Sequence, residues 1–168
     1  EGKTLTAINL AISIAKEVDY TVLLVDANLR HPWMLEQFGL SGRKGLSDFL
    51  TDDTPIAELL VQPDAIKHLV LLPGGQPLAN SAEMLNSEKM EQLVAEMKSR
   101  YPRRIIIFDL PPVLTSADAL AFSPFVDAAL LVVEEGVTQA QDLQHAVDLL
   151  KTTNIVGTVL NKAEVKTI

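Results

Sequence analysis

The chain opens with the stretch Glu1-Gly2-Lys3-Thr4, which runs directly into a segment of helical periodicity. Gly-Lys-Thr at the start of a helix is the second half of a phosphate-binding loop, whose N–H groups and lysine hold phosphates while the hydroxyl binds Mg²⁺. The helix dipole and the unpaired N–H groups of a first turn favour an anion at the same place. A tripeptide alone is a weak signal, and the other interpretation is a solvated N-terminus that binds nothing. The rest of the chain has to decide between them.

Helical and extended patterns alternate after this stretch. Apolar residues recur at helical spacing between residues 4 and 18, and an apolar run at 21–25 then ends in Asp26, as expected for a strand covered on both faces. Further strands are predicted at 69–72, 105–108, 128–133 and 155–160. Further helices are predicted at 46–50 and 56–61, after a Ser87 cap up to Tyr101-Pro102, and after a Thr138–Gln141 capping box. The alternation predicts a parallel α/β sheet with right-handed crossovers.

Length and composition narrow the function classes. The 168 residues, 48% of them hydrophobic, suffice for one domain over residues 1–168, which we expect to be truncated at both ends because it begins inside a motif. A net charge of −8 argues against a nucleic-acid-binding surface. The absence of cysteine suits a reducing compartment. Apolar runs are too short to cross a bilayer, so we expect any membrane link to come from a partner.

Two predicted strands end in carboxylates, at Asp26 and Asp109. The carboxyl ends of parallel strands share one edge of a sheet, where the helix after Thr4 would also begin. Phosphoryl transfer needs a cation on the outer phosphates, Mg²⁺ held by a hydroxyl and a carboxylate, and a group that orients or deprotonates the nucleophile. Lys3, Thr4 and the two aspartates supply these groups. A turn cap after a strand is the alternative interpretation of Asp109 taken alone.

The order of these motifs resembles the bacterial tyrosine kinases of the P-loop type, the cytoplasmic autokinases of exopolysaccharide assembly, over nearly the whole chain. Residues 1–4 are similar to the end of the family's Pro-Gly-Glu-Gly-Lys-Ser/Thr loop. Leu23-Leu24-Val25-Asp26-Ala27-Asn28-Leu29-Arg30 resembles its second acidic motif, and Ile105-Ile106-Ile107-Phe108-Asp109-Leu110-Pro111-Pro112 its Walker B segment. Shorter matches lie at 45–48, 72–75, 83–85 and 159–162. Residues 101–109 and 157–162 look closest to the exosortase-associated subgroup.

The resemblance implies a three-layer α/β/α P-loop fold of the MinD/ParA kind, with a first strand and the start of the loop before Glu1. It also implies site roles. Lys3, Asp26 and Asp109 would be catalytic, with Lys3 on the β- and γ-phosphates and Asp26 as the base for a tyrosine hydroxyl. Thr4, Asp26 and Asp109 would form the metal site. The ATP-binding residues would be Glu1, Gly2, Lys3, Thr4, Leu5 and Asn161. A strand-end asparagine that satisfies its own turn remains an alternative for Asn161.

The resemblance further implies ATP and Mg²⁺ as cofactors and an autokinase that regulates exopolysaccharide synthesis or export. It implies a membrane polysaccharide co-polymerase or chain-length determinant protein as activating partner, a possible homo-oligomer, and no nucleic acid. The location expected from it is cytoplasmic and peripheral to the inner membrane through that partner, because no transmembrane segment is seen in the chain itself.

The chain departs from the family pattern at two places. The second acidic motif normally reads Asp-x-Asp, but Asn28 stands at its second position and cannot take a proton. No tyrosine-rich tail is seen, and the tyrosines present are Tyr20 and Tyr101. Two other functions therefore stay open. One is a positioning ATPase of the MinD/ParA kind, against which Glu1 argues; the other is a nucleotide-binding scaffold whose Asn28 has impaired catalysis.

Overall fold

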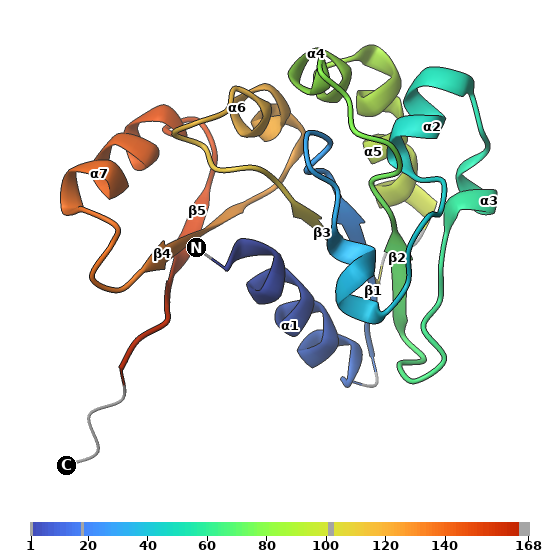
Figure 1. Ribbon diagram of the computed structural model, residues 1–168, viewed down its shortest axis with the longest axis horizontal. Coiled ribbons are helices and arrows are strands. Elements are labelled where there is room, and N and C mark those ends of the chain that lie inside the picture. The colour runs from blue at the N-terminus through green and yellow to red at the C-terminus, as the bar shows by residue number, and fades with distance from the viewer. Residues whose placement is uncertain (1, 18, 101–102, 165–168) are drawn as a thin grey trace.

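The computed structural model describes residues 2–17, 19–100 and 103–164, and helices and strands alternate along them (Figure 1). The strands are β1 (Thr21–Asp26), β2 (Leu69–Leu72), β3 (Arg104–Asp109), β4 (Ala129–Glu134) and β5 (Ile155–Asn161). The helices are α1 (Lys3–Ala15), η1 (Met34–Phe38), α2 (Leu46–Asp52), α3 (Ile56–Leu59), α4 (Ser81–Leu85), α5 (Glu88–Arg100), α6 (Asp118–Phe122), η2 (Ser123–Phe125) and α7 (Ala140–Leu149). None of these helices is long and apolar enough to span a membrane.

All pairings between the named strands are parallel, which confirms the predicted α/β architecture. β1 lies between β2 and β3, and β4 pairs with β5. The register of β1 and β3 sets Thr21 beside Arg104 at one end and Asp26 beside Asp109 at the other. Both aspartates therefore lie at the same edge of the sheet.

β1 is buried on both faces, as its lack of polar alternation predicts. Successive side chains of a strand point to opposite faces, so β1 contributes to two separate cores. One core lies beneath α1, and the other lies under α5 and α6 on the opposite face (Figure 1). The first includes Val22, Leu24, Ile8 and Ala11; the second includes Leu23, Val25, Met90, Leu93 and Phe122. α1 is thereby fixed against the sheet, with its first residue at the Asp26–Asp109 edge.

The sheet is interrupted between β3 and β4. Among the described residues β3 pairs with β1 alone and β4 with β5 alone, and a cavity of about 890 Å³ separates the two groups. Its walls are β3, β4, α1 and α7, with apolar side chains such as Ile105, Leu131 and Ala146. Two facing strand edges with helices above and below suit one more parallel strand. This is the place in the fold where the first strand expected before Glu1 would fit.

Two local predictions were wrong, and one short helix was missed. The helix predicted at 56–61 ends at Leu59, because Val61 instead pairs with Leu71 in an antiparallel bridge. The capping box predicted at Thr138 is absent, since α7 begins at Ala140 and the Thr138 hydroxyl accepts the Glu134 N–H at 2.9 Å. The short helix α4 was not predicted at all. The Ser87 cap is confirmed, because its hydroxyl accepts the Met90 N–H at 3.2 Å. The predicted helix stop at Tyr101-Pro102 lies outside the described residues.

The loop after β2 caps the N-terminus of α2 with backbone hydrogen bonds. The N–H groups of Leu46 and Ser47 donate to the carbonyls of Pro73 and Gly74 at 2.7 and 2.9 Å. These bonds satisfy N–H groups that have no partner inside a helix. Two of the shorter motif matches noted in the sequence, at 45–48 and 72–75, are therefore one interlocked structural unit.

Gly75→Ala is expected to destabilise the fold by about 3 kcal/mol, against about 1 kcal/mol for Gly39→Ala. Both glycines have positive φ, 82° and 69°, so both variants carry the left-handed backbone penalty. Only at Gly75 does the added Cβ meet atoms, 2.3 Å from Ser47 Oγ and 2.6 Å from Asp48 Oδ2, whereas Gly39 has open space. Urea unfolding of both variants measures the difference, and equal losses would contradict the tight packing at Gly75.

Candidate active site

Gly2 and the first turn of α1 form one wall of the site. Gly2 has a φ of 82°, and its carbonyl accepts the N–H and the hydroxyl of Thr6, each at 2.9 Å. A Cβ on Gly2 would lie 1.9 Å from Asn161 Nδ2, so the Asn161 side chain at the end of β5 sits directly against Gly2. The structure thus joins the first residues of the chain to the end of its last strand. Glu1 lies outside the described residues.

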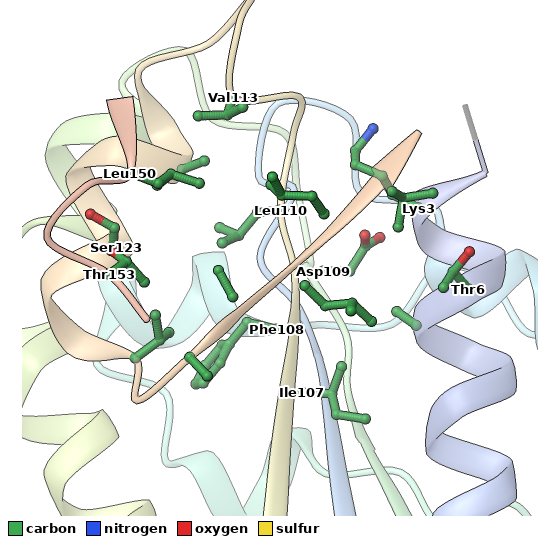
Figure 2. Close-up of a pocket in the computed structure, with 18 of the residues that line it drawn as sticks. Lys3, Thr6, Ile107, Phe108, Asp109, Leu110, Val113, Ser123, Leu150 and Thr153 are labelled. Atoms are coloured by element: carbon green, nitrogen blue, oxygen red, sulfur yellow. The ribbon is translucent and has the colours of Figure 1, made fainter. Parts of the chain in front are cut away.

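Thr4 and Asp109 form the closest polar contact of the site. The buried Thr4 hydroxyl donates to Asp109 Oδ2 at 2.5 Å, across 105 positions of sequence. Burial raises the pKa of the Asp109 carboxyl, against the hydrogen bond from Thr4 and the charge of Lys3, which lower it. Lys3 and Asp109 both line the large cavity, and Figure 2 shows them with Thr6 around its polar end, while Ile107 and Phe108 lie further along β3.

Asp26 is held by the backbone that follows it. Its Oδ1 accepts the N–H of Asn28 at 3.2 Å, and its Oδ2 accepts those of Trp33 and Met34 at 3.1 and 3.0 Å. The residue is only 1% exposed. Burial raises its pKa to about 6, helped by the nearby Asp109 charge and opposed by the three N–H groups. Three donors leave room for one more hydrogen-bond partner on this carboxylate.

The raised pKa of Asp26 makes stability pH-dependent. The folded state holds the proton up to about pH 6, whereas the ordinary pKa of 3.8 applies to the unfolded chain. Proton uptake on folding means that the free energy of unfolding falls as pH rises between these values, by about 3 kcal/mol, and stays low above pH 6. Relative to Asp26→Asn, the wild type should lose this amount between about pH 4 and pH 7. Urea unfolding at several pH values tests this, and parallel curves would contradict it.

The oxygen atoms at this edge fit Mg²⁺. The cation prefers hard oxygen ligands and commonly binds one or two carboxylates together with substrate phosphates and water. Thr4 and Asp109 are in contact, Asp26 is the register neighbour of Asp109, and all three side chains are buried. In addition, Asn28 Oδ1 is a buried oxygen with no hydrogen-bond partner in the part of the chain that the structure describes. An unsatisfied buried oxygen is costly unless a water or an ion meets it.

Leu5 and Arg30 do not point into the group formed by Thr4, Asp26 and Asp109. Leu5 is 48% exposed on the outer side of α1. Arg30 donates from Nε to Oδ1 of the buried Asp118 at 3.1 Å, which ties the loop after β1 to α6. The Ser116 hydroxyl also donates to this carboxylate. Burial acts to raise the pKa of Asp118, but the hydroxyls of Ser116 and Ser81 and the Arg30 guanidinium together outweigh it and lower that pKa below its usual range. The sequence did not indicate that Arg30 and Asp118 are partners.

Tyr20 lies far from the site. It precedes β1, whereas Asp26 ends that strand, so about 20 Å of extended chain separates them. Its side chain is 46% exposed. Tyr101 lies outside the described residues.

The chain matches a family described as an AAA domain over residues 1–163. The tyrosine-protein kinase YwqD of Bacillus subtilis is 36% identical over 163 residues, which cover 96% of this chain and 67% of the relative. The tyrosine-protein kinase CpsD of Streptococcus pneumoniae is 31% identical, covering 98% and 72%. The tyrosine-protein kinase wzc of Salmonella typhi is 32% identical, but the chain spans only 22% of it.

Solved structures agree with these sequence matches. The VpsO kinase domain is 31% identical with a TM-score of 0.88, over 98% of this chain and 80% of that one. The Escherichia coli ETK kinase domain is 28% identical with a TM-score of 0.84, over 99% and 66%. MinD of Pyrococcus horikoshii, complexed with Mg-ADP, is 21% identical with a TM-score of 0.76 over 97% and 67%, a likeness of fold alone.

Proposed function

The chain belongs to the AAA domain family and, within it, to the bacterial tyrosine kinases, and from this we propose that it is the ATP-dependent phosphotransfer domain of a protein tyrosine autokinase. The main support is the convergence of Lys3, Thr4, Asp26 and Asp109 at one sheet edge, where Thr4 contacts Asp109 directly. These residue types are the ones that phosphoryl transfer requires.

Lys3, Thr4 and Asp109 would bind the nucleotide. Lys3 would neutralise the β- and γ-phosphate oxygens, and the N–H groups at the start of α1 would donate to the phosphates. Thr4 and Asp109 would hold Mg²⁺, which supplies charge neutralisation on the transferring phosphoryl group. Asn161 packs against Gly2 in the same site, where it would contact the nucleotide base.

Asp26 would act as the general base. It would accept the proton of a tyrosine hydroxyl as that oxygen attacks the γ-phosphorus and the bond to the β-phosphate oxygen breaks, leaving phosphotyrosine and ADP. A pKa of about 6 keeps the carboxylate ionised at neutral pH yet basic enough to take a proton. Its three backbone bonds fix the carboxylate in one orientation.

Asn28 stands where the family pattern has a second aspartate, so the site has one negative charge fewer. The general base of this scheme is Asp26, which is still present. Its backbone N–H still orients Asp26, and its unsatisfied Oδ1 can accept a hydrogen bond from a metal-bound water. The proton acceptor, Asp26, is unaffected by the substitution. We therefore propose that the kinase is active although Asn28 replaces the second aspartate of the Asp-x-Asp motif.

The cellular role follows from the family resemblance. We propose that the whole protein regulates exopolysaccharide synthesis or export from the cytoplasmic side of the inner membrane, as part of a homo-oligomer activated by a membrane polysaccharide co-polymerase. We further propose that residues 1–168 form one domain, completed by a strand in the cavity between β3 and β4.

Incubation of the full-length protein with ATP and Mg²⁺ tests the activity. Phosphotyrosine detected by mass spectrometry, and lost when the metal is chelated, is the expected result. ATP hydrolysis without phosphotyrosine would instead indicate a positioning ATPase. ATP binding without turnover in calorimetry would indicate a nucleotide-binding scaffold.

A further inference from the structure

We propose that Arg30 and Asp118 are a positioning pair, whose ion pair holds the loop 27–33 so that the Asp26 carboxylate keeps the orientation needed for proton transfer. This proposal rests on the proposed kinase function and adds two residues that act on its general base without touching the reactants.

The orientation of Asp26 depends on the path of the loop that follows it. Its Oδ1 accepts the N–H of Asn28, and its Oδ2 accepts the N–H groups of Trp33 and Met34. These donors lie on both sides of Arg30 in the sequence. A shift of the loop between them would therefore break the bonds that hold the carboxylate in one position, and proton transfer depends on that position.

The loop is held by its backbone up to Leu29, and by a side chain at Arg30. The Leu29 carbonyl accepts the Leu78 N–H at 2.7 Å, and the Leu29 side chain is fully buried. Among the described residues, Arg30 is the only member of the loop 27–33 whose side chain forms a hydrogen bond, from its Nε to Asp118 Oδ1 at 3.1 Å. Loss of the Arg30 side chain would thus release the segment that leads to Trp33.

Asp118 is a fixed partner for Arg30. It is the first residue of α6 and its side chain has no exposed surface, whereas the Arg30 side chain is 43% exposed. The Ser116 hydroxyl also donates to Oδ1, and the buried Ser81 hydroxyl helps to lower the pKa of the carboxyl. Asp118 therefore stays ionised at neutral pH. A buried carboxylate of this kind needs a cation nearby, because it has lost its contacts with water.

The pair also links the two aspartates of the site. Arg30 follows Asp26 after β1, and Asp118 follows Asp109 after β3, so the ion pair joins two loops at the carboxyl edge of the sheet. Neither Arg30 nor Asp118 lines the large cavity or the cleft of about 70 Å³ beside Asp26. The two residues therefore act through the loop backbone and not by contact with ATP or the acceptor tyrosine.

Steady-state kinetics of the full-length protein on a tyrosine peptide test the pair. Arg30→Ala should lower kcat about 30-fold, with KM for ATP and for the peptide within about twofold, because only the base is displaced. Asp118→Asn keeps the shape of the side chain and an acceptor oxygen, so it should fold and should lower kcat about fivefold. Arg30→Lys keeps a cation beside Asp118 and should recover most of the loss seen in Arg30→Ala.

Lys89→Ala is the matched control for these variants. It also removes the cation of an ion pair, with Asp53 at 2.5 Å, but Lys89 lines neither cavity and lies on α5. Its kcat should stay within about twofold of the wild type. Equal kcat values for Arg30→Ala, Asp118→Asn and Lys89→Ala would overturn the positioning role.

A double variant tests whether Arg30 acts through Asp26. Arg30→Ala added to Asp26→Asn should lower the residual rate less than about twofold, because the base that Arg30 positions is already lost. A further 30-fold loss would show that Arg30 acts independently of Asp26, as a merely structural residue does, and would overturn the proposal.

Hydrogen exchange separates the pair from the kinase activity. The N–H groups of Asn28, Trp33 and Met34 should exchange about tenfold faster in Arg30→Ala than in the wild type, relative to the amides of β2, and at wild-type rates in Lys89→Ala. If this holds while the wild type forms no phosphotyrosine, the positioning of Asp26 stands and the kinase function fails. If phosphotyrosine forms but these N–H groups exchange at the wild-type rate in Arg30→Ala, the positioning pair is overturned.

Discussion

Lys3→Met is expected to lower tyrosine phosphorylation by about a thousandfold. The substitution removes a fixed positive charge from the start of α1, where Lys3 lies beside Asp109 in the large cavity. Methionine has a similar length and preserves the helix, so the fold should persist. Initial rates of phosphotyrosine formation at saturating ATP measure the effect, and circular dichroism checks the fold.

Lys16→Met is the matched control for this experiment. Lys16 caps the other end of the same helix and is exposed. Removal of its charge should change the rate less than about twofold, because the interaction with a ligand beyond the far helix end is screened. Labelling that persists in Lys3→Met at the level of Lys16→Met would refute the assigned phosphate site.

Asp26→Asn is expected to reduce phosphorylation by about 10³-fold while ATP affinity changes only a few-fold. Asparagine fills the same space and cannot accept the tyrosine proton. The nucleotide contacts assigned to Lys3, Thr4 and Asp109 remain in place, so binding and chemistry should separate. Calorimetry with ATP and Mg²⁺, beside single-turnover phosphorylation, measures the two effects.

Asp19→Asn provides the control, since this exposed aspartate lies just before β1, at the end opposite Asp26. It should leave both quantities unchanged. If Asp26 served mainly as a metal ligand, a higher Mg²⁺ concentration would restore much of the activity of Asp26→Asn. Full recovery of that kind would contradict its role as a base.

The strands and the site edge were predictable from the sequence for a physical reason. A strand covered on both faces needs a continuous apolar run, and residues 21–25 and 105–108 are such runs, each followed at once by an aspartate. Parallel pairing then sets the two carboxylates side by side. The short helices were predicted poorly because a few residues give only a weak periodic pattern. The five residues of α4 make little more than one helical turn, too few for apolar positions to recur at helical spacing. Val61 leaves the predicted helix because it forms a bridge to Leu71.

The surroundings of the site were less accessible to sequence reasoning. The residues around Asp118 do not indicate that its partner is Arg30, 88 positions away. Ion pairs between distant segments leave no periodic pattern in the sequence. The place of Trp33 beside Asp26 depends on how the chain turns after β1, which no local sequence pattern shows. The Gly2–Asn161 contact likewise exists only once β5 is folded against the start of α1.

The position of Tyr20, one strand length away from Asp26 of its own chain, determines the reaction order of any labelling there. A molecule cannot bring this residue to its own carboxylate without unravelling β1, so a second molecule has to act on it. At concentrations low enough to dissociate the homo-oligomer, the initial velocity of Tyr20 modification should then rise with the square of enzyme concentration, and dilution should suppress it faster than the turnover of an added peptide.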